Sequence, residues 1–142
     1  MSATNRIRIA PQLRRRIEEH GERGYPLESC GLLIGRAGPG ETVVEGVTHA
    51  RNLNKERAHD RYVLDPRDFL AAQQQATEQG ADVVGIWHSH PDHPARPSQT
   101  DLDAAWPEYS YVIVSVADGN VRGLRSWRLD GDNFIEERLE YE

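Results

Sequence analysis

The sequence predicts a mixed α/β fold in which a largely antiparallel sheet is flanked by helices. Helical patterns alternate with short apolar runs over the first hundred residues. Two strand-like runs are joined by a turn that contains Gly-Pro-Gly, and three more strand-like runs near the C-terminus are separated by the turn sequences DGN and DGD. The 142 residues fit one domain, residues 1–142, that can bury a core without disulfides or a structural metal.

Composition narrows the class of protein. Lys and Arg total 17 against 23 Asp and Glu, which gives a formal charge of -6. This charge argues against partners such as nucleic acid or acidic membrane. Cys30 is the single cysteine, so no intramolecular disulfide and no thiolate-rich zinc site can form. No apolar run approaches the roughly 18 residues of a membrane span. We therefore expect a soluble, cytoplasmic protein.

The first half of the chain begins with a predicted amphipathic helix. Residues 11–20 place Leu13 and Ile17 four positions apart among charges, and Gly21 or Gly24 offers a stop. The runs CGLLIG and ETVVEGVTHA then predict a hairpin around RAGPG. Residues 50–61 are polar and aperiodic, which indicates an ordered loop or flap, or only a solvated connection, followed by a brief strand at residues 62–64.

The second half starts with a helix that has clear signals at both ends. Asp65 is its expected N-cap, Pro66 its first residue and Gly80 its end, with Phe69, Leu70 and Ala76 on the apolar side. The run DVVGIWHSH predicts a strand that Pro91 terminates. A short helix over residues 98–106 and strands over residues 110–117, 121–129 and 133–140 complete the chain.

Two histidines lie at the end of the strand before Pro91. Because side chains alternate along a strand, His88 and His90 project from one face and Ser89 from the other. An isolated His-x-His is more often without function than a metal site. The sequence Ser98-Gln-Thr-Asp101 by itself indicates only a capped helix start.

The position of Asp101 strengthens the case for a metal. Three prolines stiffen the short crossing from the strand end to the next helix, so Asp101 in the first helical turn can reach the two histidines. Two imidazoles and one carboxylate suit zinc and leave a fourth position for water, as in catalytic sites. His93 is the competing ligand, although it lies in the irregular segment. We expect Asp103 to be solvated because it is on another face of the helix.

Hydrolysis assisted by zinc also needs a residue that accepts a proton and returns it to the leaving amine. Glu28 in PLESCGLLIG immediately precedes an apolar strand and is the best candidate. The acids at positions 18, 19, 136 and 137 lie in plainly charged runs that are typical of solvated surfaces.

These residues together resemble the signature of the JAMM (MPN-plus) metalloproteases. The signature is a Glu, then His-Ser/Thr-His-Pro, a gap, and Ser-x-x-Asp, and here Glu28, His88–Pro91 and Ser98–Asp101 fill every position. The resemblance extends over essentially the whole chain and implies the JAMM/MPN-like fold, with its cytidine-deaminase-like layering.

The resemblance implies a role for each motif residue. His88, His90 and Asp101 would bind a single zinc ion per chain, Glu28 would be the general base, and Ser98 would stabilise the oxyanion, although its hydroxyl can instead cap the helix. Pro91 would be structural. Ser89, which faces away from the metal, would support the site by a hydrogen bond.

Other zinc patterns are absent from the sequence: the His-Glu-x-x-His of zincins, the Pro-Cys-x-x-Cys of deaminases and the paired cysteines of zinc fingers. MPN-like domains also occur as scaffolds without metal, but those lack some of the ligands that this chain retains. Oligomeric state stays open, and a homodimer is compatible with the sequence.

The resemblance also bears on the substrate. Small prokaryotic members act on ubiquitin-like sulfur-carrier proteins that end in Gly-Gly, either releasing cysteine from the carrier or removing the carrier from lysines. Because this chain is compact, cysteine release is the preferred expectation, and lysine isopeptide cleavage is the alternative. The loop from Arg51 to Arg61 is a candidate wall of the groove, where its arginines would meet an acidic carrier surface or a cysteine carboxylate.

Overall fold

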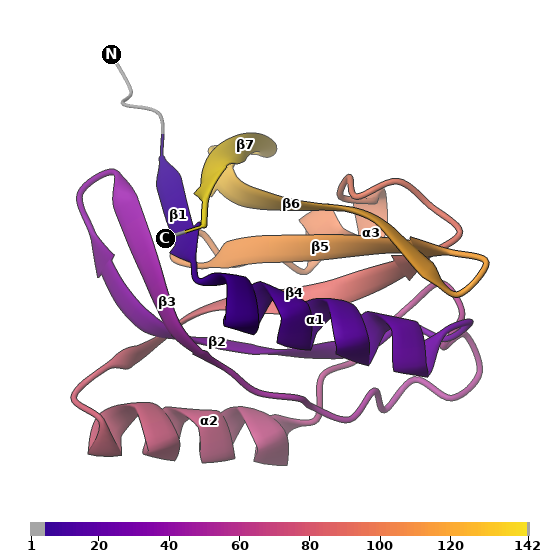
Figure 1. Ribbon diagram of the computed structural model, residues 1–142, viewed down its shortest axis with the longest axis horizontal. Coiled ribbons are helices and arrows are strands. Elements are labelled where there is room, and N and C mark those ends of the chain that lie inside the picture. Colours follow the sequence, from indigo (N-terminus) through magenta and orange to yellow (C-terminus); the bar gives the residue numbers. More distant parts are fainter. Residues whose placement is uncertain (1–4, 142) are drawn as a thin grey trace.

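A computed structural model describes residues 5–141, and its sheet is a closed barrel in the order β1-β3-β2-β4-β5-β6-β7 (Figure 1). The elements are β1 (Arg6–Ile9), α1 (Pro11–Gly24), β2 (Cys30–Gly38), β3 (Glu41–Val47), α2 (Pro66–Glu78), β4 (Asp82–Pro91), α3 (Gln99–Asp103), β5 (Ser110–Ala117), β6 (Asn120–Asp130) and β7 (Asn133–Glu140). β1 pairs in parallel with β3 and β7, and β4 with β5, whereas the other neighbours are antiparallel. The predicted mixed α/β class is confirmed.

The two longer helices cover opposite faces of the sheet. Leu32 and Leu33 are consecutive in β2 and therefore point to opposite sides. Leu33 packs in one buried cluster with Ile17 of α1, and Leu32 packs in the other with Ala72 and Ala76 of α2. Over the described residues, no helix is long and apolar enough to cross a membrane.

The first helix is longer than the sequence predicts. It continues through Gly21 to Gly24, so of the two predicted stops Gly24 is correct, whereas Gly21 and the bound near residue 20 are wrong. Gly21 is buried on the same side as Leu13 and Ile17. A Cβ at this position would lie 3.2 and 3.3 Å from methyl groups of Val114 and Val116. This glycine therefore permits close packing of α1 on β5.

Strand β1 is not among the predicted elements, although its pattern is simple. Ile7 and Ile9 are fully buried, while Arg6 and Arg8 alternate with them on the outer side. Arg6 forms an ion pair of 3.1 Å with Glu41 of β3. The alternation in RIRI is the signal that identifies this strand, and its pairing with both β3 and β7 closes the barrel.

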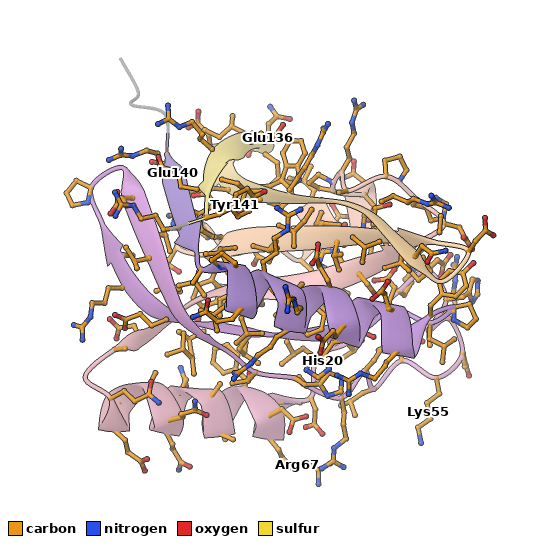
Figure 2. All side chains as sticks on the ribbon, viewed as in Figure 1. His20, Lys55, Arg67, Glu136, Glu140 and Tyr141 are labelled. Carbon is orange, nitrogen blue, oxygen red and sulfur yellow. The ribbon has the colours of Figure 1, made fainter. Side chains whose placement is uncertain are left out.

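The hairpin and the following loop are close to expectation. β2 and β3 pair as predicted, but β2 extends through Gly38 and shortens the turn. The loop over residues 51–61 is ordered by Asn52, whose amide donates to the carbonyls of Glu28 and Arg61 at 3.2 and 3.1 Å. Lys55 extends from this loop away from the body of the molecule (Figure 2).

The predicted strand at residues 62–64 is wrong. Only a single bridge, between Asn52 and Leu64, forms there. The N–H of Val63 donates to the side chain of Asn52 at 3.0 Å, and a side-chain partner of this kind does not extend into a ladder. The segment is therefore part of the loop that precedes α2.

The ends of the second helix are as predicted, but one residue predicted on its apolar face is exposed. Asp65 caps α2 by accepting a 2.9 Å hydrogen bond from the N–H of Arg67, and Gly80 has a φ of +67° just after the helix. Ala72 and Ala76 are the buried residues of α2. The prediction that Leu70 lies on the apolar side is wrong, because the alanine stripe contacts the sheet and leaves Leu70 58% exposed.

The C-terminal third forms the predicted meander. β5, β6 and β7 are joined by turns in which Gly119 and Gly131 have positive φ. The preceding helix α3 ends at Asp103 instead of residue 106. Pro107 disfavours helical backbone at Trp106, the residue before it, which accounts for part of this shortening.

Candidate metal centre and catalytic site

The two motif histidines lie where β4 ends, on the face opposite α1. β4 is a central strand between β2 and β5, so His88 is paired on both sides, with Cys30 and Ile113, and His90 is paired with Ser115 of β5. His88 is fully buried, and its ring stacks on Tyr62 with centroids 4.7 Å apart. His90 is also buried, at 6% exposure. Packing in the sheet therefore fixes both imidazoles before any ligand binds.

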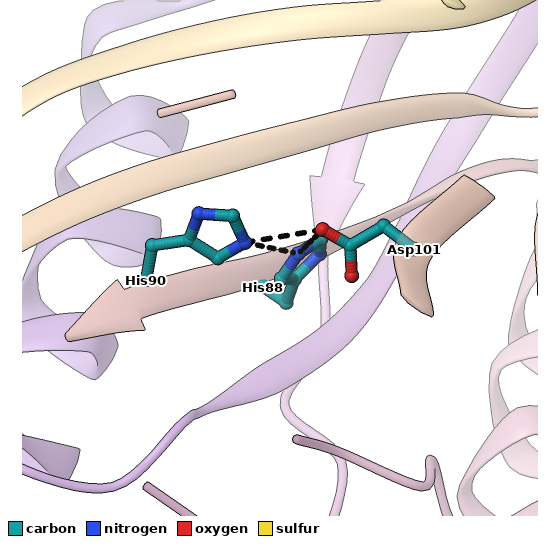
Figure 3. A group of neighbouring side chains, drawn as sticks. All are labelled: His88, His90 and Asp101. Carbon is teal, nitrogen blue, oxygen red and sulfur yellow. Dashed lines mark hydrogen bonds and ion pairs between the residues drawn. The ribbon is translucent and has the colours of Figure 1, made fainter. Parts of the chain in front are cut away.

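The crossing segment brings Asp101 to these histidines, as predicted. Asp101 is in the first turn of α3, and its Oδ2 lies 3.1 Å from Nε2 of His90 and 3.4 Å from Nε2 of His88. The two Nε2 atoms are 3.2 Å apart (Figure 3). Among the described residues, His88, His90 and Asp101 form the cluster of three metal-ligating side chains whose ligand atoms are close enough to share one ion. Asp101 comes from a different element than the histidines, so the fold assembles the site.

The three separations fit a tetrahedral ion. Ligand atoms bound to one zinc ion at about 2.0–2.1 Å, at the corners of a tetrahedron, lie about 3.3 Å from one another. The observed distances of 3.1, 3.2 and 3.4 Å between the three atoms are close to that edge. Two imidazoles and one carboxylate are a donor set that zinc accepts. These residues therefore fit the metal that the motif implies.

A hydrogen bond orients the imidazole of His90, whereas packing orients that of His88. Nδ1 of His90 lies 2.9 Å from the carbonyl oxygen of Pro94, which can only accept, so Nδ1 carries the proton and donates. Nε2 of His90 is then free to bind a cation. Nδ1 of His88 is buried without a hydrogen-bond partner among the described atoms. The orientation of His88 therefore depends on packing against Tyr62.

Burial and charge set the protonation of the three groups. Burial lowers the pKa of His88, which keeps that imidazole neutral. Burial acts in the same direction on His90, but the hydrogen bond and charge of Asp101 outweigh it and raise the pKa of His90. Burial opposes ionisation of Asp101, yet the two histidines hold its pKa well below the usual range. The site thus presents an ionised carboxylate and a neutral His88.

Glu28 lies beside this group, two residues before β2 begins. The ladder pairs Cys30 with His88, and the hydrogen bond from the N–H of Ser89 to the Ser29 carbonyl continues the contact by one residue. Glu28 lines the same pocket as His90. The backbone N–H of Glu28 donates to the carbonyl of Ala58. The side chain is only 7% exposed, and burial raises its pKa from 4.5 to about 8. A carboxyl with a pKa near neutrality can both accept and return a proton.

Ser98 and Asp101 form the capping box that the sequence indicates. Ser98 Oγ accepts from the N–H of Asp101 at 3.1 Å, and Asp101 Oδ2 accepts from the N–H of Ser98 at 2.8 Å. The Ser98 hydroxyl therefore caps α3. As an acceptor in this bond it retains its own O–H for donation elsewhere, and Ser98 lines the same pocket as Glu28 and His90.

Ser89 and Pro91 lie around the site without pointing into it. Ser89 Oγ accepts a 2.8 Å hydrogen bond from the N–H of Ser29, the neighbour of Glu28. Pro91 is the last residue of β4 and pairs with Val116 of β5. The next residue, Asp92, has a φ of 61°, which turns the chain toward α3.

The two competing residues are not in the cluster. His93 is exposed and lines the pocket next to His90, outside the group of three. Asp103 is exposed and accepts from the side chain of Gln99 at 2.8 Å. Sequence reasoning missed two contributors, the ring of Tyr62 and the carbonyl of Pro94. The backbone carbonyl of Pro94 could not be identified from the sequence, because every residue has one. Tyr62, an aromatic residue after a polar loop, gives only a weak signal.

Two pockets meet at the cluster. A pocket of about 310 Å³ is lined by Glu28, Asp60, Arg61, His90, His93, Pro94, Arg96 and Ser98. A more apolar pocket of about 260 Å³ contains Asp101, and its lining includes Tyr62, Val63 and Trp106. Asp60 and Arg61 line both, so the end of the loop over residues 51–61 stands between them.

Comparison with known proteins agrees with this geometry. A family model described as prokaryotic homologs of the JAB domain matches residues 10–130. The chain is 34% identical over 140 residues to a Haloferax volcanii protein named desampylase, with 94% of each chain covered. It is 34% identical over 119 residues to the CysO-cysteine peptidase of Mycobacterium tuberculosis, covering 83% of this chain and 79% of that one.

A solved structure shares the fold as well. The solution structure of a Desulfitobacterium hafniense protein superposes with a TM-score of 0.84 at 30% identity, covering 96% of this chain and 92% of that one. The resemblance inferred from the motif is therefore confirmed. This chain belongs to the family of prokaryotic homologs of the JAB domain.

Proposed function

We propose that this protein is a zinc metallopeptidase that hydrolyses the bond after the C-terminal Gly-Gly of a ubiquitin-like carrier protein and, by preference, releases cysteine. The observation that carries the proposal is the convergence of His88 Nε2, His90 Nε2 and Asp101 Oδ2 at tetrahedral spacing beside a buried glutamate. Relatives named desampylase and CysO-cysteine peptidase support the substrate class.

His88, His90 and Asp101 would hold the metal. Bound zinc supplies Lewis acidity, which lowers the pKa of a coordinated water and polarises a carbonyl. The residues of the chain supply the remaining chemistry. Their burial excludes bulk water, and the hydrogen bond from His90 to the Pro94 carbonyl keeps the Nε2 lone pair directed inward.

Glu28 moves the protons. Its carboxylate accepts a proton from the attacking water as the water oxygen bonds to the glycine carbonyl carbon. It then delivers that proton to the leaving nitrogen as the carbon–nitrogen bond breaks. The products are the carrier with a free glycine carboxyl group and the released amine. The raised pKa of Glu28 suits this double role, because both forms are accessible near neutral pH.

Ser98 is positioned to stabilise the developing oxyanion. Its Oγ is fixed by the N–H of Asp101, which leaves the hydroxyl proton available to donate into the pocket shared with Glu28. Capping and oxyanion stabilisation are therefore compatible functions of one hydroxyl group. Ser89 positions the segment before β2 that carries Glu28, through its bond to Ser29.

The neighbouring loop offers walls for the substrate tail. A Gly-Gly tail has no side chains, so it fits a narrow passage. Asp60 and Arg61 of the loop line both pockets at the cluster, which supports this loop as one wall of the groove. The apolar pocket around Tyr62, Val63 and Trp106 would take the residues of the carrier tail that precede the glycines.

The test uses one recombinant ubiquitin-like carrier in two forms, one ending in Gly-Gly-Cys and one joined through its terminal glycine to a lysine side chain. Intact mass follows both with zinc-loaded protein. We expect cleavage after Gly-Gly, faster for the cysteine form. Faster cleavage of the lysine form would identify an isopeptidase. Protein that holds zinc and cuts neither form would overturn the proposal in favour of another substrate or a scaffold role.

A further inference from the structure

The pocket on the Glu28 side of the cluster carries two arginines that the hydrolysis mechanism does not use. Arg61 comes from the loop after β3, and Arg96 from the crossing between β4 and α3. The same pocket is lined by the proposed base Glu28, the metal-site residue His90, and Ser98. A group bound by these arginines would therefore lie next to the bond being cleaved.

Neither guanidinium is neutralised within the described chain. Arg61 donates to the hydroxyl of Thr100 at 2.9 Å and forms no ion pair among residues 5–141. Arg96 forms no side-chain hydrogen bond or ion pair in that range. The other acid at the pocket, Asp60, is bound by two nitrogens of Arg57 at 3.1 and 2.5 Å. The pocket thus retains an excess of positive charge in a protein whose formal charge is -6.

The hydrogen bond from Arg61 to Thr100 also determines where that charge lies. Thr100 is in α3, one residue before Asp101. The contact therefore links the loop to the helix that supplies the third metal-site residue. An arginine held by one nitrogen at this point retains other N–H groups for an anion, and a carboxylate is one of the anions whose geometry its planar fork matches.

We propose that Arg61 and Arg96 form a carboxylate subsite that binds the α-carboxylate of the leaving residue. This inference rests on the proposed peptidase function and specifies its substrate: a single amino acid with a free carboxyl terminus. In such a substrate the carboxylate is separated from the scissile nitrogen by one carbon atom. A lysine joined through its side chain places a long aliphatic segment there instead. The subsite therefore favours release of a terminal amino acid over cleavage of an isopeptide.

The test compares two carriers that differ in one group. A ubiquitin-like carrier is ligated to cysteine with a free carboxylate or to cysteine carboxamide, so that the thiol and the scissile bond are identical. We expect wild-type protein to favour the acid by about 10-fold to 100-fold in kcat/KM, the range for one or two charge-assisted hydrogen bonds. In Arg61→Gln and Arg96→Gln, the acid-to-amide ratio should fall toward one, chiefly through loss of activity on the acid.

Two controls separate recognition from folding. Arg36→Gln removes an exposed arginine that pairs with Glu45 on the distant hairpin, and it should leave the ratio unchanged. Arg61→Lys retains the charge without the fork and should restore part of the preference. Binding of both carriers to the Glu28→Gln protein, measured by calorimetry, gives the same ratio without turnover.

The outcomes distinguish the two levels of the proposal. Equal cleavage and equal binding of acid and amide by wild-type protein would overturn the carboxylate subsite and leave the peptidase function standing. A preference that survives in both arginine variants would also overturn it. If zinc-loaded protein neither cuts nor binds either carrier, the peptidase proposal itself is wrong, and the subsite is rejected with it.

Discussion

Ser89 Oγ accepts a hydrogen bond of 2.8 Å from the backbone N–H of Ser29, and the N–H of Ser89 donates to the Ser29 carbonyl at 2.9 Å. The serine between the two histidines thus holds the residues just before β2, which include Glu28. This contact gives the serine of the His-Ser-His sequence a positioning role on the face away from the metal-site residues.

Replacing Ser89 by alanine should reduce both stability and cleavage. The change leaves the buried N–H of Ser29 without its partner, which costs about 1–3 kcal/mol in the free energy of unfolding. Because Glu28 immediately precedes Ser29, the change should also displace the base, so kcat should fall while the zinc content stays constant. Ser126→Ala is the matched control, because it breaks a buried 2.8 Å bond to Glu137, and neither residue lines the two pockets at the cluster. It should lower stability with little effect on kcat, and an equal loss of kcat in both variants would argue against positioning.

Metal content should follow the three-residue cluster. We expect about one zinc ion per chain in the purified protein, measured by elemental analysis, since the donor set suits a site with three protein ligands. His88→Ala and His90→Ala should each lose most of the metal. His93→Ala should retain it, because His93 lies outside the cluster. Metal loss in the His93 variant would show that the third ligand has been assigned wrongly.

Glu28→Gln separates catalysis from structure. The amide keeps the size of the side chain but cannot accept the proton, so hydrolysis should fall by about 10²-fold to 10⁴-fold. Zinc content and the folded state should persist at neutral pH. Cleavage at the wild-type rate would remove Glu28 from the mechanism, and loss of zinc would make it a ligand instead of a base.

The same substitution predicts a pH dependence of stability in metal-free protein. Burial raises the pKa of Glu28 from 4.5 to about 8, so the folded state holds this proton more tightly than the unfolded state does. The resulting stability is fully present below pH 4.5 and is lost as pH rises through 8. Relative to wild type, Glu28→Gln should therefore become more stable between these pH values, by on the order of a few kcal/mol at pH 8.

Chemical denaturation with a chelator present, at several pH values, measures this difference. Subtracting the wild-type curve from the variant curve isolates the titration of Glu28 together with its coupling to His90. A difference that does not change with pH would mean that Glu28 is solvated in the folded protein.

Much of the site was predictable because its residues lie in short motifs. The alternation along β4 places His88 and His90 on one face, and the cap at Ser98 places Asp101 in a first helical turn. The close approach of Asp101 to the histidines depends on the path of the crossing, which the prolines indicate only approximately. The burial of Glu28 and its shifted pKa depend on the loop that covers it, and that loop has no periodic signal.

The errors in the predicted fold come from contacts between segments that are distant in the sequence. Glycine ends many helices, but here close packing against β5 keeps Gly21 inside α1. Val63 has a β-branched side chain, which favours a strand, but its N–H donates to the side chain of Asn52, so no strand forms. Such outcomes depend on tertiary contacts that a single segment does not encode.

The closure of the barrel by β1 is short, and this restricts where another chain could pair with the sheet. β1 covers Glu41–Val44 of β3, whose other side is paired with β2, so this stretch has backbone partners on both sides. Asn133–Glu137 of β7 pair with β6 alone. Many domains capture an extended peptide by adding it as a further strand to an unpaired edge. β1 therefore removes Glu41–Val44 from the part of the sheet that such a peptide could extend.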